Sequence, residues 1–337
     1  METQLSICIP TYNREKYLKQ LLDCIEKQLQ DIEKNIVEIC VSDNSSTDNT
    51  QQMIQQYQQK YNNITYFRWD KNMGADMNYL KVVEIAHGKY CWLFGSDDLM
   101  IDGAIKKMLE EIKEDCDIYL VNSIQYDIKV TTILSKYTIL KKNITTRIFK
   151  FNNDNDILEY FKSVNILEGY FSYLSSLIFK KEQWNSIEFD KSFIGTAYAH
   201  TYILLSLLKE KIKLKYINNP IIIHRTGNDS FACDGFVRRL KLDFDGYKKL
   251  FTVVFKDNKN LSNYYNVFLK NSFSYIDLAG LYQKSEKQDR KLLVSFVKET
   301  HNIYMIKILS FFIFIYRKLF KKIFIRCKIH KFLSKKL

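Results

Sequence analysis

Two adjacent carboxylates, Asp97 and Asp98, follow a short apolar run that ends at Gly95. The run from Tyr90 to Phe94 has the length and composition of a buried strand. Acidic side chains at the end of a strand in an α/β sheet lie in the crevice where ligands bind. Paired carboxylate oxygens suit a hard cation, Mg²⁺ or Mn²⁺, which can bridge a diphosphate and neutralise its charge. The alternative is a turn in which an aspartate caps the next helix.

Two more polar clusters follow strand-like segments. Residues 10–14 come after a predicted strand over 4–9, and residues 42–48 come after one over 36–41. Because ligands bind at the carboxyl ends of parallel strands, we expect all three clusters to face one crevice. A carboxylate there can accept hydrogen bonds from a base or ribose, and a guanidinium can reach a phosphate. The residues that supply such groups, with backbone groups that can frame a base, are Thr11, Tyr12, Arg14 and Asp43.

Strand and helix patterns alternate four times in the first hundred residues. Strands are predicted over 4–9, 36–41, 64–69 and 90–94, and helices follow the first three. The first helix has one apolar face, formed by Leu18, Leu21, Leu22, Ile25 and Leu29. This alternation predicts an α/β fold with a mostly parallel sheet and helices on both faces. The chain has no glycine-rich dinucleotide motif after the first strand and no Gly-Lys-Ser/Thr loop, so a nucleotide would be held in another way.

Composition narrows the class of protein. The chain has 337 residues, 46% hydrophobic, which suits a folded protein of one large domain or two ordinary ones. Seven cysteines without Cys-x-x-Cys spacing indicate reduced thiols in a cytoplasmic protein rather than disulfides or a zinc site. The net charge is +13, but ten Lys and Arg residues and no acidic ones lie in 300–337, which leaves +3 for the rest. No nucleic-acid partner is therefore expected.

Five motifs in this order and spacing resemble the family 2 glycosyltransferases of the GT-A fold. They cover about the first 110 residues and are Ile9-Pro10-Thr11-Tyr12-Asn13-Arg14, Val41 to Asp48, Asn72-Met73-Gly74, Ala86 to Tyr90, and Ser96-Asp97-Asp98. The resemblance implies a nucleotide-sugar transferase, and the motif style is similar to the abequosyltransferase-like branch of O-antigen or capsule assembly.

The resemblance also implies roles for single residues. Asp97 is expected nearer the ribose, and Asp98 is expected to be a catalytic residue that binds the metal, Mn²⁺ or Mg²⁺. The residues expected to contact the nucleotide sugar are Pro10, Thr11, Tyr12, Arg14, Asp43, Asn72, Gly74, Asp76, Ser96, Asp97 and Arg225.

The catalytic base is expected at the start of a helix near residue 199. Family members often carry a Glu-Asp pair there, whereas this chain has His200. A histidine that titrates near neutrality can take a proton from an acceptor hydroxyl. The alternative is a histidine packed at a helix start. Residues before a predicted strand over 174–179 are expected to line the acceptor pocket, namely Gly169, Tyr170 and Ser172.

A late strand over 217–223 contains Pro220 and is predicted to lie at a sheet edge, because proline cannot donate to a central ladder. His224 and Arg225 follow it. In many enzymes of this fold a histidine so placed reaches the metal and a neighbouring basic residue lies near the diphosphate. His224 is therefore an expected metal ligand with Asp98, and the alternative is an ordinary strand-end histidine.

The expected domains are a catalytic domain over 1–230, a helical extension over 231–299 and a basic amphipathic tail over 300–337. The catalytic domain is divided into a nucleotide-sugar half over 1–115 and an acceptor half over 116–230; residues 126–151 stay unassigned. The tail combines Lys and Arg with Phe and Ile, which suits an anionic membrane surface. The alternative is a helix that packs on the catalytic domain.

Together these features predict an inverting, metal-dependent glycosyltransferase. It would move a sugar from a nucleotide diphosphate to a hydroxyl of a polyprenyl-linked or oligosaccharide acceptor, at the inner face of the cytoplasmic membrane, in bacterial surface polysaccharide synthesis. Three alternatives are an inactive GT-A module that binds a nucleotide sugar or scaffolds a membrane assembly, a nucleotidyltransferase, and a basic nucleic-acid binder. A nucleotidyltransferase would have a glycine-rich loop with basic residues after the first strand, where this chain has Thr11-Tyr12-Asn13.

Overall fold

A mixed ten-stranded sheet forms the centre of the described chain, which comprises residues 2–136 and 138–316 of a computed structural model. The strand order is β3-β2-β1-β4-β9-β6-β10-β5, and β7 and β8 pair with β6 and β10. The strands are β1 (Leu5–Thr11), β2 (Val37–Asp43), β3 (Ile64–Arg68), β4 (Tyr90–Leu93), β5 (Leu99–Met100), β6 (Ile118–Tyr126), β7 (Ile133–Ser135), β8 (Arg147–Lys150), β9 (Leu177–Lys180) and β10 (Lys213–Arg225).

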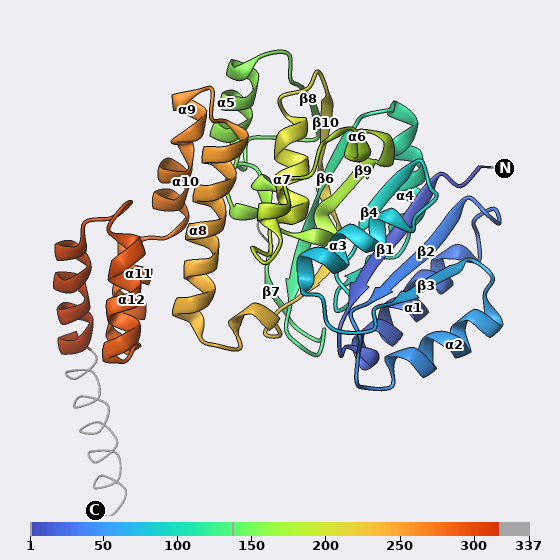
Figure 1. Cartoon of the computed structure of the whole chain (residues 1–337), viewed down its shortest axis with the longest axis horizontal. Helices are drawn as coiled ribbons and strands as arrows, with labels where there is room; N and C mark the ends of the chain where they lie inside the picture. The colour runs from blue at the N-terminus through green and yellow to red at the C-terminus, as the bar shows by residue number, and fades with distance from the viewer. Residues whose placement is uncertain (1, 137, 317–337) are drawn as a thin grey trace, which may run out of the picture. The chain divides into compact units, whose positions relative to one another are not determined.

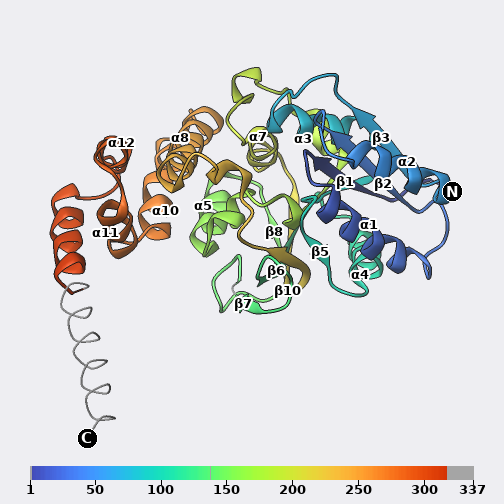
Figure 2. The same cartoon turned by 90° about the horizontal axis from the view of Figure 1, so that it is seen from below.

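The first four strands are parallel, as the alternating pattern predicts. β1 pairs with β2 and β4, and β2 pairs with β3, all in parallel. Every residue of β1 is buried, because helices cover both of its faces. In Figure 2, α3 (Ala75–Glu84) and α7 (Ala199–Leu207) lie on one side of these strands, and α1 (Glu15–Leu29) and α4 (Ala104–Glu111) lie on the other.

The remaining helices complete two compact units, one over Met1–Asp229 and one that begins at Ser230. In the first unit they are α2 (Thr50–Lys60), α5 (Asp154–Ser163) and α6 (Lys181–Ser186). The second unit contains only helices and short turns in its described part (Figure 1): α8 (Phe236–Val254), α9 (Lys259–Ser262), α10 (Tyr264–Ser272), α11 (Tyr275–Lys284), α12 (Lys287–Val297) and a helix over 303–316. No helix in the described residues is long and apolar enough to cross a membrane.

The prediction of an edge strand around Pro220 is wrong. β10 lies between β6 and two short partners, β8 and β5. Its register against β6 shifts between Ile217 and Ile222, so the proline sits at an irregularity where it need not donate to the ladder. Residues 126–151, which the sequence left unassigned, contribute β7 and β8.

At the amino ends of the central strands, Gly88 packs against the backbone of β1. Its N–H donates to Ser6 Oγ at 2.8 Å, and Ser6 Oγ donates to Glu38 Oε1 at 2.6 Å. A Cβ at position 88 would lie 2.7 Å from the Ser6 nitrogen and 2.9 Å from the Leu5 carbonyl carbon. The site therefore requires glycine because two backbones approach closely.

We expect Gly88→Ala to lower the free energy of unfolding by about 1–3 kcal/mol, the usual cost of overpacking a rigid site. Chemical denaturation followed by circular dichroism measures it. Gly280→Ala in α11 is the matched control: no atom lies within 4 Å of its added Cβ, so it should leave stability equal or slightly higher. Equal stability of Gly88→Ala and wild type would contradict the close-approach argument.

Candidate active site

Four chain segments meet at the carboxyl edge of the sheet. The Asn44 N–H donates to the Thr11 carbonyl at 2.9 Å, which joins the ends of β2 and β1. The Arg14 guanidinium donates to the Asp97 carboxylate, which joins the turn after β1 to the turn after β4. The Arg225 N–H donates to Asp98 Oδ1 at 3.0 Å and brings in the end of β10. The polar clusters therefore converge at one edge.

The two carboxylates after β4 point in different directions. Asp98 is 3% exposed, and its Oδ2 accepts hydrogen bonds from Tyr173 Oη at 2.7 Å and Ser175 Oγ at 2.6 Å. Burial raises the pKa of Asp98 above the usual value of an aspartate. The Asp97 side chain is 22% exposed and accepts from Arg14 and from the Asn228 amide. Asp97 therefore faces the opening, whereas Asp98 ties the turn to the segment before β9.

His224 lies next to this pair. Its ring stacks on Tyr173 with centroids 4.5 Å apart, and Tyr173 in turn donates to Asp98. His224 Nδ1 is buried without a hydrogen-bond partner among the described residues. The described chain holds no group of three or more His, Cys, Asp or Glu that could bind a metal ion by itself. The donor set fits a divalent cation that takes most of its ligands from a diphosphate and water, which is how Mg²⁺ is usually held.

The two arginines of the site differ in availability. Arg225 is 4% exposed and donates to the carbonyls of Asp97 and Ile128 and to Gln20 Oε1, each at 2.7–2.8 Å. The N–H groups of the Arg225 guanidinium are thus already bonded to neighbouring parts of the protein. The Arg14 side chain is 17% exposed at the same edge. Arg14 is the better-placed cation for a phosphate, whereas the sequence also assigned that role to Arg225.

Asp43 is fully buried and orders the turn that follows β2. Its Oδ1 accepts the Ser46 N–H at 2.8 Å, and its Oδ2 accepts from Tyr66 Oη at 2.7 Å. Next to it, Pro10 and Thr11 belong to β1, and Thr11 Oγ1 is a buried hydroxyl without a hydrogen-bond partner in the described chain. Tyr12 is 42% exposed. The side chain of Tyr12 can therefore contact a ligand directly, whereas that of Asp43 is covered by protein.

The loop before α3 is held by its own polar side chains. Asn72 Oδ1 accepts from the Asn44 amide and from the Gly74 N–H, both at 2.9 Å. Gly74 has φ +83°, a conformation that favours glycine, and α3 begins at the next residue. Ser96, on the turn after β4, is buried.

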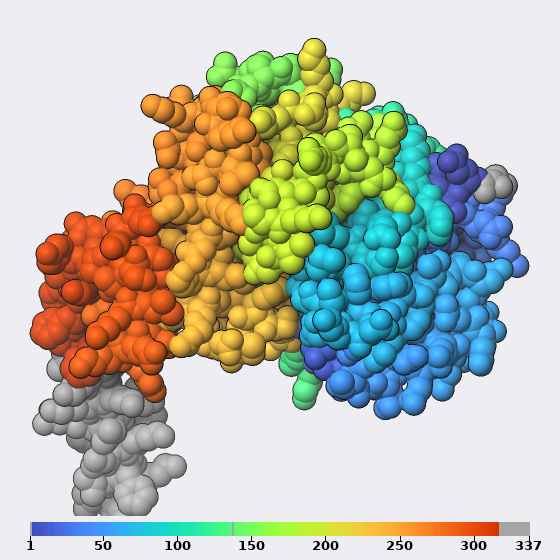
Figure 3. Space-filling view, viewed as in Figure 1, coloured from blue at the N-terminus to red at the C-terminus, as the bar shows by residue number. Residues whose placement is uncertain are grey.

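Asp76, in the first turn of α3, clamps the loop that precedes α7. It is 2% exposed and accepts the N–H groups of Gly195, Ala197 and Ala199 at 2.8–2.9 Å. Burial raises the pKa of Asp76, and these N–H groups favour the ionised form. The sequence suggested contact with the nucleotide sugar; in the structure the side chain contacts the protein loop. Figure 3 shows the yellow-green segment around α7 against the cyan α3.

His200 lies inside the protein. It is 1% exposed, packs edge-on against Tyr79 with ring centroids 5.3 Å apart, and lies 3.2 Å from Thr201 Oγ1 through Nε2. Burial lowers the pKa of His200 to about 4. The imidazole of His200 has no exposed face that an acceptor hydroxyl could reach. A base with that pKa also accepts protons only weakly at neutral pH. This geometry favours the packed alternative over the role of catalytic base.

The expected acceptor residues also face inward. Gly169 and Tyr170 are buried, and Gly169 lies so close to Val164 that a Cβ would be 2.5 Å from its side chain. Ser172 is half-buried. The segment carries Phe171 at φ +65°, and left-handed residues other than glycine also occur in the loops with Asn13, Ser45 and Ala197. Such backbone conformations persist where surrounding contacts over-determine them, which is common at functional sites.

Sequence reasoning missed several residues that build the site. Asn78 of α3 bonds the Thr11 and Ser42 carbonyls, and Tyr173, Ser175 and Asn228 hold the two aspartates. A signal existed for both Tyr173 and Ser175, because Tyr173 stands directly before the predicted strand over 174–179 and Ser175 is its second residue. Asn78 and Asn228 carried none.

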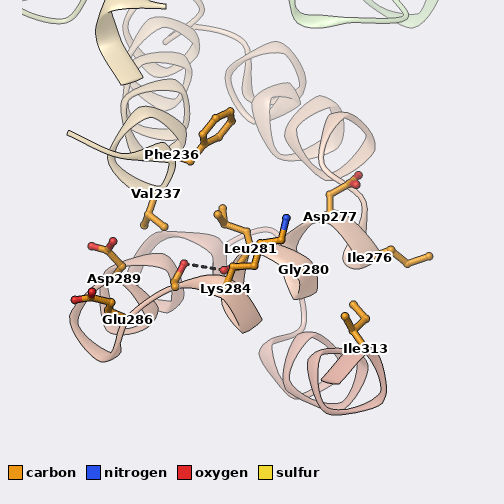
Figure 4. A pocket seen from close by; sticks show the side chains of 11 residues that line it. Phe236, Val237, Ile276, Asp277, Gly280, Leu281, Lys284, Glu286, Asp289 and Ile313 are labelled. Carbon is orange, nitrogen blue, oxygen red and sulfur yellow. Dashed lines mark hydrogen bonds between the residues drawn. The ribbon is translucent and has the colours of Figure 1, made fainter. Parts of the chain in front are cut away.

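A separate hollow of about 810 Å³ lies within the second unit, between α8, α11, α12 and the helix over 303–316 (Figure 4). Its lining is apolar in part, with Phe236, Val237, Ile276, Leu281 and Ile313, and polar in part, with Asp277, Lys284, Glu286 and Asp289. None of the residues assigned to the site above lines it.

Comparison with known proteins identifies relatives. The family model described as "Glycosyl transferase family 2" matches residues 6–181. Abequosyltransferase RfbV of Salmonella typhimurium is 38% identical over 293 residues, which is 85% of this chain and 86% of that protein. The GalNAc(5)-diNAcBac-PP-undecaprenol beta-1,3-glucosyltransferase of Campylobacter jejuni is 23% identical over 86% of this chain and 85% of its own length.

Two solved structures share the fold. S. aureus TarS 1-349 in complex with UDP-GlcNAc matches with a TM-score of 0.62 and 18% identity, over 91% of this chain and 84% of TarS 1-349. Mannosyltransferase PcManGT of Pyrobaculum calidifontis, in complex with GDP-Man and Mn²⁺, matches with a TM-score of 0.50 and 13% identity, over 92% of this chain and 84% of its own. At these identities the likeness supports the GT-A fold alone.

The burial of His200 predicts a pH dependence of stability. The folded pKa, about 4, lies below the ordinary value near 6.5, so the unfolded chain binds the proton more tightly. The contribution of the neutral, buried His200 to the free energy of unfolding is complete above pH 6.5. It is lost as the pH falls toward 4, and the loss amounts to at most about 3 kcal/mol. Urea unfolding between pH 7.5 and 4.5 should therefore show a smaller loss of stability in His200→Gln than in wild type. The pKa of His301 is also lowered by burial, so part of the dependence should persist. An identical slope in both proteins would contradict this.

Proposed function

The chain belongs to glycosyl transferase family 2, and from this premise we propose that it transfers a sugar from a nucleotide diphosphate to a hydroxyl of a lipid-linked glycan in bacterial surface polysaccharide synthesis. One observation carries the proposal: Arg14 contacts Asp97, both side chains are partly exposed, and the exposed Tyr12 lies two residues before Arg14 in the same turn. The aromatic ring of Tyr12 offers a surface on which the base can lie, and the charged groups can bind the phosphates.

The proposed donor lies along the carboxyl edge of the sheet. Tyr12 and the backbone around Thr11 contact the base, and Arg14 contacts the diphosphate. Asp97 is proposed to face the diphosphate through a bound cation, because its side chain is 22% exposed and that of Asp98 is buried. The relatives support a nucleotide-sugar donor, since the TarS structure contains UDP-GlcNAc and the PcManGT structure contains GDP-Man.

We keep a divalent cation, Mn²⁺ or Mg²⁺, as part of the proposal. Asp97 and His224 would hold it together with diphosphate oxygens and water, the buried Asp98 would add its negative charge from the protein side, and the cation would neutralise charge on the leaving nucleotide. Mn²⁺ in the PcManGT structure supports this for the fold. Within the chain, Tyr173, Ser175 and the Arg225 backbone keep the Asp98 carboxylate in place.

The acceptor is proposed from the relatives' own names. RfbV is an abequosyltransferase, and the Campylobacter relative is named for a glycan carried on PP-undecaprenol. By analogy we propose a sugar hydroxyl on a polyprenyl diphosphate glycan at the inner face of the cytoplasmic membrane. The inverting course stays part of the proposal, but His200 does not enter it as the base, because its imidazole is buried.

The burial of His200 also favours a second candidate, an inactive module that binds a nucleotide sugar without transferring it. The two candidates differ in turnover. Incubation with the lipid-linked acceptor and UDP-, GDP-, CDP- and dTDP-sugars should release a nucleoside diphosphate if the chain is an active transferase. Binding of a donor with no release would favour the inactive module.

The different orientations of the two aspartates give a prediction. Asp97→Asn should reduce transfer by about a hundredfold or more, because it weakens the hold on the cation that stabilises the developing negative charge, and should leave the melting temperature within about 2 °C. Asp98→Asn should lower the melting temperature by several degrees, because the NH2 group that replaces one carboxylate oxygen cannot accept the hydrogen bonds made to that oxygen. Thermal unfolding and nucleotide release measure both. Full activity of Asp97→Asn would refute the assignment of Asp97 to the diphosphate.

Membrane attachment is a further part of the proposal, supported by the helix over 303–316. Its inward side is covered, with Ile306 at 1% and Ser310 at 9% exposure. Its outward side carries large apolar side chains that are 45–78% exposed, namely Tyr304, Met305, Ile308, Phe311, Phe312 and Tyr316. Residues 317–337, which lie outside the described residues, contain nine Lys and Arg and no acidic residue in sequence. An apolar stripe beside a basic segment suits an anionic bilayer.

We expect the full chain to cosediment with phosphatidylglycerol vesicles and only weakly with phosphatidylcholine vesicles. The double variant Phe311→Gln, Phe312→Gln should bind phosphatidylglycerol at least about tenfold more weakly, since each buried phenylalanine contributes about 1.5–3 kcal/mol. Val267→Gln, at a 48% exposed position on α10, is the control and should bind like wild type. Unchanged binding of the double variant would contradict a docking role of the stripe.

A further inference from the structure

We propose that the hydroxyl group of Tyr79 binds the sugar portion of the donor. The inference rests on the proposed function and adds a residue that fits none of the motifs of the sequence. Tyr79 lies on α3, one residue after Asn78, which bonds the strand ends at the carboxyl edge, and its ring packs against His200 of α7.

The position of Tyr79 is set on both sides by its neighbours in sequence. Asn78, the preceding residue, accepts from Ser42 Oγ at 2.7 Å and donates to the Ser42 and Thr11 carbonyls at 2.9 and 3.2 Å. Asp76, three residues earlier and thus on the same side of the helix, accepts three N–H groups of the loop before α7. Tyr79 is therefore held on a helix that is bonded to two strand ends and to the opposing loop, as a precise binding group requires.

The ring and the hydroxyl of Tyr79 have different surroundings. The ring packs edge-on against the buried His200, with centroids 5.3 Å apart and an interplanar angle of 88°. The hydroxyl makes no hydrogen bond to any described residue, and it is not among the polar atoms sealed from solvent without a partner. The apolar part of the side chain is thus used by the protein, and its polar tip is available to a ligand.

The charges around the hydroxyl identify the kind of ligand. The carboxylates of Asp76, Asp97 and Asp229 and the guanidinium of Arg14 all act on Tyr79. Burial, first, and these carboxylates raise the pKa of Tyr79 far above its usual value, so it stays protonated and can donate a hydrogen bond. A sugar hydroxyl can accept that bond and donate its own proton to a nearby carboxylate.

The order of groups in the donor leads to the same conclusion. In a nucleotide sugar, the sugar is attached directly to the diphosphate that Arg14 and Asp97 are proposed to contact. The charges of both residues interact with Tyr79, and the Tyr79 ring also packs against α7. Because Asn78 ties this part of α3 to the Thr11 carbonyl at the same edge, the sugar is the part of the donor that we assign to the Tyr79 hydroxyl.

The test compares Tyr79→Phe, which removes only the oxygen, with Tyr202→Phe on α7. The Tyr202 hydroxyl donates to the Glu188 carbonyl at 3.3 Å at an exposed position, so this variant controls for loss of a tyrosine oxygen away from the edge. Calorimetric titration of each full-length protein with Mn²⁺ present uses two ligands: the sugar nucleotide that stabilises wild type most among UDP-, GDP-, CDP- and dTDP-sugars, and the same nucleoside diphosphate without sugar.

We expect Tyr79→Phe to bind the sugar nucleotide about three- to tenfold more weakly, the loss of one hydrogen bond, and the free diphosphate within twofold of wild type. Tyr202→Phe should match wild type for both ligands, and all three proteins should unfold within 2 °C of one another. Equal weakening of both ligands by Tyr79→Phe, or no weakening, would overturn the inference. If wild type binds none of the sugar nucleotides, the proposed function itself fails, an outcome that differs from the first two.

Discussion

The turn after β4 is the constraint on which the site depends. Two adjacent aspartates would repel each other if both faced the same space, and the protein separates them by direction. Asp98 turns inward to two hydroxyls and a backbone N–H, and Asp97 turns outward to Arg14 and Asn228. Each contact reaches a different segment, so one turn joins β1, β9 and β10 at the edge where a nucleotide would bind.

Two other buried acids near the site work in the same way. Asp43 and Asp76 are at most 2% exposed, and each holds a loop by accepting hydrogen bonds from backbone N–H groups or a hydroxyl. A buried carboxylate without such donors would cost several kcal/mol, so these loops are fixed by the need to satisfy it. The site therefore contains rigid internal acids and a smaller set of accessible groups: Tyr12, Arg14, Asp97 and the tip of Tyr79.

The two units use apolar surface differently. In the first unit, large apolar side chains fill both faces of a sheet that helices cover. In the second unit, the helix over 303–316 buries one side and exposes aromatic residues on the other. Exposed apolar patches on a soluble surface usually mark an interaction site, which is why the membrane proposal rests on this helix as well as on the basic sequence after it.

The sequence by itself determined the alternation of strands and helices and the three polar clusters at strand ends, because periodicity and turn residues act over a few neighbouring positions. It also carried the family motifs within residues 9–98. It did not determine the orientation of Asp97 and Asp98, the burial of His200 or the committed donors of Arg225. Those follow from contacts between residues far apart in the sequence, in the pairs Tyr173–Asp98, Tyr79–His200 and Gln20–Arg225. Only tertiary packing brings such groups together, since which side chain reaches solvent depends on what distant segments place over it.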